Sequence, residues 1–380
     1  MAVETGAMRR LAMHPLARVW TCVTVLLATI GGASALWSRS DGPGAVQPAK
    51  PSPTAAAGVG GGLQQLAKPW HLDIGTAVQP APFERDERYR TTLTQEFGSI
   101  TAESQLKWDV LQPAEGQFDW SGADALVGFA EANGMAVRGH TLVWHMALPA
   151  WLEKGSFSPD QLRELLRSYI QATVGRYRGR IGVWDVVNEP LADASGQLRK
   201  SFWLNALGPG YIADALRWAH EADPQAKLYI NDFGVENLNR KSDALYTMVA
   251  KLRADGVPVD GVGFQTHVTI DTPPKTLRDN LRRFADLGVE VAITELDVRS
   301  AGAATDTSRS GQAVVYAGVL RDCLAVPRCV SVTVWGFTDA YSWIPHAYPG
   351  WGNACLFDDA FRPKTAYGQI RQVLTEAPGR

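Results

Sequence analysis

The sequence has almost no net charge. Its 37 basic and 39 acidic residues leave a formal net charge of −2 over 380 residues. A chain with so little net charge produces no long-range field that attracts nucleic acid or an acidic surface. We therefore expect no nucleic-acid partner, and a neutral substrate fits the composition best.

Cysteine is also scarce, with four in the chain and no C-x-x-C pair, which disfavours a structural zinc site. Cys22 lies in an apolar N-terminal run. Cys323 and Cys329 are six positions apart, close enough for a disulfide that secures the short connection into a strand near Val330. Cys355 is left over, and we expect a buried thiol there.

The N-terminal region has the pattern of an export signal. Arg9, Arg10 and Arg18 precede an uncharged run over residues 19–37, which contains the cleavage pattern Ala33-Ser34-Ala35 near its end. The run is about as long as a membrane span, so a retained segment would anchor the protein in a membrane, but cleavage is the favoured interpretation. In both cases we expect the body of the protein to be secreted or exported, where disulfides persist.

The sequence predicts three parts. Residues 1–37 form a signal peptide or signal anchor, residues 38–62 form a linker rich in Pro, Ala and Gly, and residues 63–376 form a folded domain. Since 46% of the residues are hydrophobic, a chain of this length can bury a large core. We expect the protein to act as a monomer.

The folded part alternates short β-branched runs with longer segments of helical period. Eight such units match an α/β fold of the (β/α)8 TIM-barrel type. A doubly wound open sheet is disfavoured because no glycine-rich phosphate loop follows the first strand. The predicted strands are Leu72 to Val78, Gly98 to Ala102, Met135 to Trp144, Ile181 to Val187, Lys227 to Asn231, Gly261 to Val268, Val289 to Val298 and Val330 to Phe337.

The stretch from Val183 to Pro190, VWDVVNEP, places an Asn and a Glu at the end of a buried strand. Its residues are large or β-branched, and Pro190 cannot continue a central ladder. Asn188 and Glu189 then emerge at the C-terminal edge, where α/β barrels bind their ligands. An isolated Asn-Glu pair is more often a loop cap or an ion-pair partner, so catalysis needs a second group.

A second carboxylate stands at the end of the seventh strand. The segment AITELDV puts Glu295 and Asp297 on one face of that strand. An eight-stranded barrel is narrow enough for side chains at the ends of strands four and seven to meet across its mouth. Two facing carboxylates are what glycoside hydrolysis requires. Glu189 would protonate the leaving oxygen and Glu295 would attack the anomeric carbon with net retention, without a metal or cofactor.

The segment GFQTH brings His267 and Gln265 to the same region. We expect His267 to donate a hydrogen bond to Glu295 while Asp297 orients the imidazole. The donor would keep Glu295 ionised, and the charge on Glu295 would keep Glu189 protonated at rest. Alternatively, His267 and Asp297 form a purely structural pair at the top of the barrel.

Seven segments of the sequence, in their order and spacing, closely resemble the glycoside hydrolase family 10 endo-β-1,4-xylanases. They are ITAESQLKWD, RGHTLVWH, WDVVNEP, YINDF, GFQTH, ITELD and VWGFTDAYSW. The likeness covers about Leu63 to Leu374, and WDVVNEP with ITELD is its most specific part. It implies a retaining barrel enzyme that cleaves xylan, with Glu189 as general acid/base and Glu295 as nucleophile. The family's short disulfide matches Cys323 and Cys329.

The same resemblance implies which residues hold the sugar at the cleavage point. Asn188 would bind its 2-hydroxyl, where hydrogen bonds strengthen in the transition state, and Lys107 and His140 would hold its 3-hydroxyl. From the residues alone, Lys107 could instead be a surface cation, and His145 a packing residue. The other expected substrate contacts are Glu103, Trp144, Gln265, Trp335 and Trp343.

Three positions depart from the family pattern. Ser104 stands where the family has Asn, and Ala147 stands where it has Gln. The family residues help to hold the sugar one unit beyond the cleavage point, at the −2 subsite, so we expect weaker binding there. Gly234 replaces the second Asn of the usual NDYN.

The residues leave three other functions to weigh. A β-glucanase or an aryl-β-glycosidase would use the same two carboxylates on a different substrate. A sugar-binding barrel without catalysis is disfavoured by the intact Glu189 and Glu295. A metallohydrolase is disfavoured because strand one lacks paired histidines, and Asp73 alone is no metal site.

Overall fold

The computed structural model describes residues 61–193 and 195–376. The expected signal at 1–37, with Cys22, and all but the last two residues of the expected linker lie outside the described residues. The first helix begins at Leu63. No helix in the described ranges is long and apolar enough to cross a membrane.

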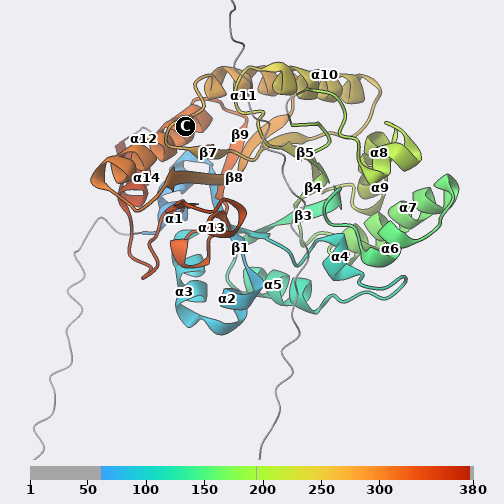
Figure 1. Ribbon diagram of the computed structural model, residues 1–380, viewed down its shortest axis with the longest axis horizontal. Helices are drawn as coiled ribbons and strands as arrows, with labels where there is room; N and C mark the ends of the chain where they lie inside the picture. The colour runs from blue at the N-terminus through green and yellow to red at the C-terminus, as the bar shows by residue number, and fades with distance from the viewer. Residues whose placement is uncertain (1–60, 194, 377–380) are drawn as a thin grey trace, which may run out of the picture. The chain divides into compact units, whose positions relative to one another are not determined.

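Parallel strands close into a barrel, which confirms the predicted fold class (Figure 1). Closure comes from the pairing of the first strand with the last, with Asp73 opposite Ser331 and Thr76 opposite Val334. The eight barrel strands are β1 (Asp73–Val78), β2 (Ser99–Ala102), β3 (Ala136–Trp144), β4 (Val183–Asn188), β5 (Lys227–Asp232), β6 (Gly261–Phe264), β8 (Glu290–Ala301) and β9 (Cys329–Val334). A two-residue strand, β10 (Trp351–Gly352), pairs antiparallel with the end of β8.

Helices surround the barrel (Figure 1). They are α1 (Leu63–Ala67), α2 (Pro80–Arg85), α3 (Glu87–Glu96), α4 (Trp108–Leu111), α5 (Ser121–Ala132), α6 (Ala150–Lys154), α7 (Pro159–Arg176), α8 (Phe202–Leu207), α9 (Tyr211–Ala222), α10 (Arg240–Ala254), α11 (Leu277–Asp286), α12 (Asp306–Leu324), α13 (Ile344–Ala347) and α14 (Thr365–Glu376), with 3-10 turns η1 (Lys68–Trp70) and η2 (Asp339–Tyr341). Helices α7, α9, α10, α11 and α12 coincide to within a few residues with the segments of clearest helical period in the sequence, which are Ser158 to Tyr177, Tyr211 to Glu221, Asp243 to Ala254, Pro274 to Leu287 and Arg309 to Leu324. In α7 the start is fixed by Ser158, which forms a capping box with Gln161 and precedes a proline at the first helical position.

Strand β4 is buried on both faces, as its composition predicted. Trp184 is fully buried, and Gly139 on the neighbouring strand leaves room for its ring. A Cβ atom at Gly139 would lie 2.2 Å from the indole of Trp184, so only glycine permits this close packing. The strand ends at Asn188, two residues before Pro190.

The prediction of one strand from Gly261 to Val268 was wrong. Strand β6 ends at Phe264, and a separate strand β7 (His267–Thr269) pairs with the outer part of β8. The break lies at Thr266, which has a left-handed φ of 66° and donates its backbone N–H to Glu236 Oε1 at 2.9 Å. A residue with positive φ cannot continue a strand, so the chain turns there.

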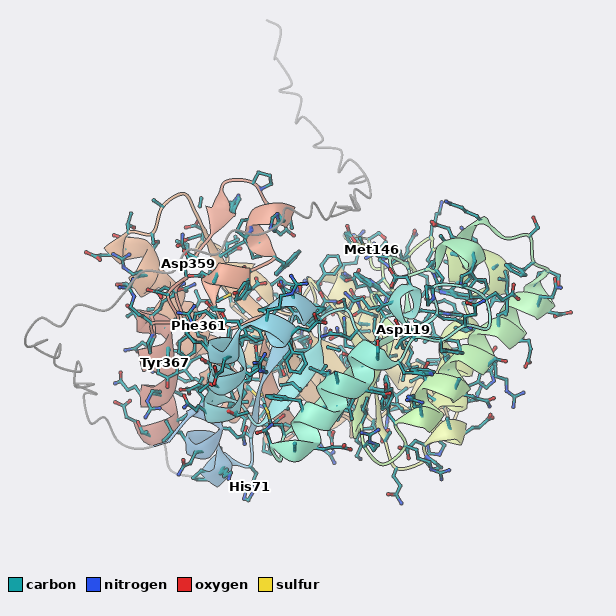
Figure 2. The ribbon with its side chains drawn as sticks, turned by 90° about the horizontal axis from the view of Figure 1, so that it is seen from below. His71, Asp119, Met146, Asp359, Phe361 and Tyr367 are labelled. Carbon is teal, nitrogen blue, oxygen red and sulfur yellow. A yellow bond between two sulfur atoms is a disulfide. The ribbon has the colours of Figure 1, made fainter. Side chains whose placement is uncertain are left out.

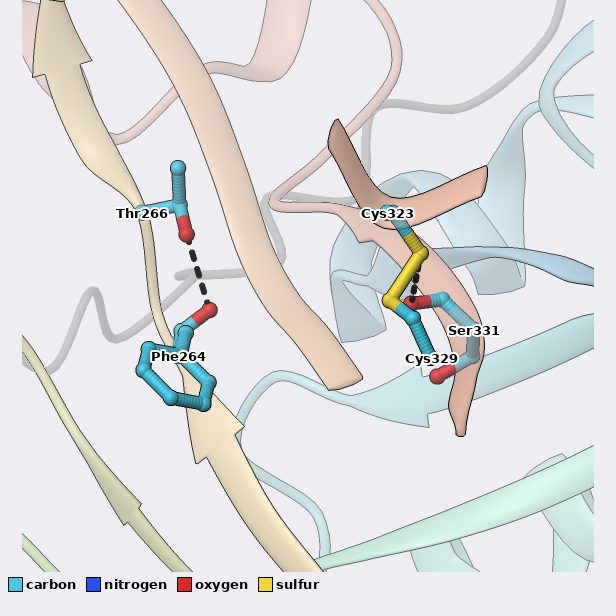
Figure 3. The surroundings of a disulfide bond; sticks show 5 residues. All are labelled: Phe264, Thr266, Cys323, Cys329 and Ser331. Atoms are coloured by element: carbon cyan, nitrogen blue, oxygen red, sulfur yellow. Dashed lines mark hydrogen bonds between the residues drawn. A yellow bond between two sulfur atoms is a disulfide. The ribbon is translucent and has the colours of Figure 1, made fainter. Parts of the chain in front are cut away.

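The predicted disulfide is confirmed. Cys323 near the end of α12 is bonded to Cys329 at the start of β9, beside Ser331 (Figure 3). The bond therefore secures the connection between the last long helix before β9 and the strand that closes the barrel. Cys355 is a buried free thiol, as expected, and burial raises its pKa well above the usual value.

Replacing both Cys323 and Cys329 by Ala should lower the free energy of unfolding by about 2 kcal/mol, because the unfolded chain regains the entropy of one short loop. Denaturant unfolding of the variant measures this loss, and reducing the wild-type protein should reproduce it. A midpoint that does not move in either experiment would contradict a stabilising role for the disulfide.

Candidate active site

Glu189 lies at the turn that follows β4. Its backbone adopts a left-handed φ of 57°, a conformation that non-glycine residues rarely take. Its N–H donates to the carbonyl oxygen of Asn231 on β5 at 2.8 Å. Strain of this kind persists only where surrounding contacts hold it, and it is common at functional sites.

A chain of side-chain amides connects Glu189 to Glu295 near the ends of the strands. Gln265 Nε2 donates to Glu189 Oε1 at 3.3 Å and to Asn188 Oδ1 at 3.2 Å. Asn231 Nδ2 donates to the same Asn188 oxygen at 2.9 Å and to Glu295 Oε1 at 2.7 Å. Both carboxylates thus belong to one hydrogen-bond network.

Asn231 was not singled out from the sequence. It is fully buried, and its amide oxygen accepts a bond from Thr294 Oγ1 at 2.7 Å, which fixes the orientation of the amide. Gly263 leaves the space for it, since a Cβ atom there would lie 2.2 Å from Asn231 Oδ1. The available signal was its place in YINDF, near the end of the fifth strand, where the other site residues also lie.

His267 lies between the carboxylates of Glu295 and Asp297. Its Nε2 is 3.1 Å from Glu295 Oε2, and its Nδ1 is 2.8 Å from Asp297 Oδ2, which also accepts a bond from Trp343 Nε1 at 2.8 Å. Burial opposes charge on this imidazole, but the two carboxylates prevail and raise the pKa of His267 well above the usual value.

The resulting imidazolium affects Glu295 in turn. Burial alone would raise the pKa of Glu295, but the hydrogen bond from His267 and the nearby imidazoles lower it below the usual value. Glu295 is only 5% exposed, yet these groups favour its ionised form. This is the charge state that the sequence predicted for the attacking carboxylate.

A second buried ion pair, between Asp185 and Arg138, contacts His140. Asp185 Oδ2 is 3.1 Å from His140 Nδ1, and Asp185 also accepts two bonds from Arg138, at 3.0 and 2.5 Å. Burial opposes ionisation of Asp185, yet Arg138 and His140 hold its pKa below the usual value. The carboxylate therefore favours the His140 tautomer with its proton on Nδ1, and leaves Nε2 for other contacts. Neither Asp185 nor Arg138 was predicted.

Glu103 and Lys107 follow β2, as expected. Glu103 Oε1 accepts a bond from Gln79 Nε2 at 3.1 Å, and Lys107 Nζ lies 4.6 Å from the centre of the Trp144 ring. Burial raises the pKa of Glu103 to about 7 against the opposing charge of Lys107, and burial also lowers the pKa of Lys107. Lys107 is therefore a half-buried cation, in contrast to the surface alternative.

The expected tryptophans surround the histidines. The centre of the Trp335 ring lies 5.2 Å from that of the His140 ring and 6.2 Å from that of the His267 ring. The centre of the Trp343 ring lies 5.0 Å from that of the His267 ring. His145, expected to be a packing residue, has its Nδ1 3.9 Å from Glu189 Oε2. Burial and the charge of Arg199 lower the pKa of His145 to about 4, so a neutral imidazole lies beside Glu189.

Comparison with known proteins gives one consistent result. A family model described as Glycosyl hydrolase family 10 matches residues 62–373. Endo-1,4-beta-xylanase B of Thermotoga neapolitana is 41% identical over 318 residues, which cover 83% of this chain and 92% of that protein. Endo-1,4-beta-xylanase A of Phanerodontia chrysosporium is 41% identical over 311 residues, or 81% of this chain and 76% of that protein. The crystal structure of xylanase 10B from Thermotoga petrophila RKU-1 in complex with xylobiose has a TM-score of 0.81 at 38% identity, covering 84% of this chain and 98% of that one.

Replacing His267 by Gln should shift the acidic limb of the kcat/KM profile to higher pH. The imidazolium lowers the pKa of Glu295, so its removal raises that pKa, and Glu295 becomes protonated earlier as the pH falls. The pH profile on a soluble substrate measures the limb. His220→Gln, at an exposed histidine of α9, is the control and should leave the limb in place. A limb that stays or moves to lower pH in His267→Gln would contradict the proposed coupling.

Proposed function

The chain belongs to glycosyl hydrolase family 10, and from this membership we propose that it hydrolyses internal β-1,4-xylosidic bonds of xylan with retention of configuration. The curated relatives compared above are endo-1,4-beta-xylanases at about 40% identity, and the solved relative of the same fold was crystallised with xylobiose. The protein is a glycoside hydrolase by this membership.

The observation that carries the mechanism is the contrast between the two carboxylates. Glu295 is buried and held ionised by His267, which suits a nucleophile that attacks the anomeric carbon. Glu189 accepts a hydrogen bond from the neutral amide of Gln265 and lies beside the neutral imidazole of His145. This environment suits the group that delivers a proton to the leaving oxygen.

The reaction then has two steps. Glu295 displaces the leaving sugar and forms a covalent glycosyl-enzyme, while Glu189 protonates the departing glycosidic oxygen. Glu189, now a carboxylate, removes a proton from water as that water attacks the anomeric carbon. The bond to Glu295 breaks, and the product keeps the original configuration.

The hydrogen bonds indicate which atoms would hold the sugar. Both amide bonds to Asn188 fall on its Oδ1, so its NH₂ group is the part that can donate to the 2-hydroxyl. His140 uses Nδ1 on Asp185, which leaves Nε2 for the 3-hydroxyl, together with Lys107. Gln265 stays within the amide chain, Glu103 borders Lys107, and the rings of Trp144, Trp335 and Trp343 would enclose the sugar.

The −2 subsite would lack two polar contacts. Ala147 is 4% exposed and carries no polar side chain, and Ser104 offers only a short hydroxyl. The residue that precedes Ala147 in the chain, Met146, follows His145 and is 65% exposed at the surface (Figure 2). We therefore propose that the sugar beyond the cleavage point is held more weakly than in relatives with Asn and Gln at these positions.

The N-terminal residues have the pattern of an export signal followed by a linker. We infer that residues 1–37 direct export and are then cleaved, that residues 38–62 serve as a linker, and that residues 63–376 are the catalytic domain. This rests on the charge, apolar run and composition of the sequence. A secreted, monomeric enzyme that needs no cofactor is the expected mature form.

Hydrolysis of xylohexaose followed by NMR should show the β-anomer as the first product, because two displacements restore the configuration. Glu295→Ala should lower kcat at least about a thousandfold. Glu290→Gln is the matched control, since Glu290 lies at the opposite end of the same strand and bonds Tyr229. A first product with the α-anomer would exclude the mechanism, and activity that survives in Glu295→Ala would exclude its nucleophile.

Installing the family residues in the double variant Ser104→Asn, Ala147→Gln should lower KM for xylo-oligosaccharides by about tenfold, since two new hydrogen bonds contribute roughly 1 kcal/mol or slightly more in total. Initial rates on xylotriose and xylotetraose measure the change. Ser104→Ala serves as the control and should change KM little. An unchanged KM in the double variant would contradict a weakened −2 subsite.

A further inference from the structure

The turn that carries Glu189 is hydrogen-bonded at each successive backbone group. Besides the bond from Glu189 N–H to β5, Arg199 Nε donates to the carbonyl oxygen of Glu189 at 3.0 Å, and Arg199 N–H donates to that of Pro190 at 2.7 Å. The next donor along the chain, Leu191 N–H, bonds Asp232 Oδ2 at 3.2 Å. Four consecutive polar groups thus hold a turn whose Glu189 has a strained φ.

Asp232 and Lys241 form a buried carboxyl–ammonium contact that the catalytic steps do not use, in which burial raises the pKa of Asp232 to about 7 against the opposing charge of Lys241. It is fully buried at the end of β5, and its Oδ1 lies 2.8 Å from Lys241 Nζ, which is itself only 3% exposed. Lys241 also donates to the carbonyl oxygen of Phe233 at 2.6 Å, while Phe233 N–H donates to Asp232 Oδ1 at 2.9 Å. Oδ1 is therefore fixed from one side, and Oδ2 is left to hold Leu191.

A pair of this kind is poorly explained as a source of stability. Burying two charges removes both from water, and apolar residues of similar size are often as stabilising. The pair instead fixes the orientation of the Asp232 carboxylate. With Oδ1 held by Lys241 and Phe233 N–H, Oδ2 can hold a third donor, Leu191 N–H, in a fixed place. That donor lies two residues after Glu189, in the turn that sets the direction of its side chain.

We propose that Asp232 and Lys241 are positioning residues for Glu189, which hold its carboxyl group where it protonates the leaving oxygen. This rests on the proposed function, in which Glu189 is the general acid. Lys241 orients the carboxylate of Asp232, Asp232 anchors Leu191, and the anchored turn fixes Glu189. Loosening this chain moves the proton donor, whereas the hydrogen bonds of Glu295 come from His267 and Asn231 and not from Asp232 or Lys241.

The test uses kcat/KM for two aryl β-xylobiosides on the full-length enzyme. A phenyl leaving group needs a proton as it departs, whereas a 2,4-dinitrophenolate departs without one. In Asp232→Asn the side chain keeps a single oxygen, which cannot satisfy Lys241, Phe233 N–H and Leu191 N–H together. We expect at least about a tenfold loss on phenyl xylobioside and less than about twofold on the dinitrophenyl substrate, because misplacement of the acid weakens proton transfer alone.

Lys241→Met is the second variant and should show the same selective loss, so the test survives if one variant fails to fold. The matched control is Lys364→Met. Lys364 bonds a largely buried carboxylate, Asp339 Oδ2, at 2.7 Å and a backbone carbonyl at 2.8 Å, but it does not contact the Glu189 turn. Any decrease in kcat/KM of Lys364→Met should be equal on both substrates.

Glu189→Ala separates the two levels of the proposal. If it loses far more on phenyl than on dinitrophenyl xylobioside while Asp232→Asn and Lys241→Met lose equally on both, the positioning role is wrong and the acid assignment stands. If Glu189→Ala itself shows no dependence on the leaving group, the acid assignment fails, and the positioning role fails with it.

Discussion

The active site depends on a buried hydrogen-bond chain that joins the side chains of three barrel strands. Asn231 on β5 donates to Asn188 on β4 and to Glu295 on β8, so the side chains of three strands meet at one amide. In a buried setting such bonds strengthen one another, and each unmade bond would be costly. Gly263 and Thr294 fix the amide on its other side. The network therefore connects the two carboxylates through residues at or just beyond the ends of the barrel strands.

Different neighbours give the two carboxylates different tasks. Glu295 accepts a bond from a charged imidazole, which is itself held by Asp297 and, through that carboxylate, by Trp343. The carboxylate of Glu189 contacts the neutral amide of Gln265 and the neutral imidazole of His145, and its turn is fixed by Arg199 and Asp232. The nucleophile is thus controlled through charge, while the acid is controlled mainly through position. A substitution among the neighbours of one carboxylate should alter the role of that carboxylate without removing the role of the other.

The sequence predicted the barrel and the carboxylates because both leave local patterns. Strand and helix periodicity is read directly from the chain, and a polar residue at the end of a buried strand is visible without coordinates, as at Glu189 and Glu295. The break at Thr266 was missed because a threonine with a left-handed backbone has no compositional signal in the sequence. Asp185, Arg138 and Lys241 were missed for another reason. A buried charge is recognised only with its partner, and these partners lie on other elements. Ser104 and Ala147 stood out through the family resemblance alone, since neither residue has a chemical pattern of its own.

If Glu295 is the nucleophile, it forms a covalent bond to the sugar, and that bond can be trapped. A xylobioside with fluorine in place of the 2-hydroxyl and a dinitrophenyl leaving group forms the intermediate faster than water can release it, because loss of the 2-hydroxyl contact slows both steps while the good leaving group restores the first. Mass spectrometry of the digested, inactivated enzyme should find one fluoroxylobiosyl group, on the peptide that contains Glu295 and on that residue. A label on another carboxylate, or full inactivation without any label, would contradict the account.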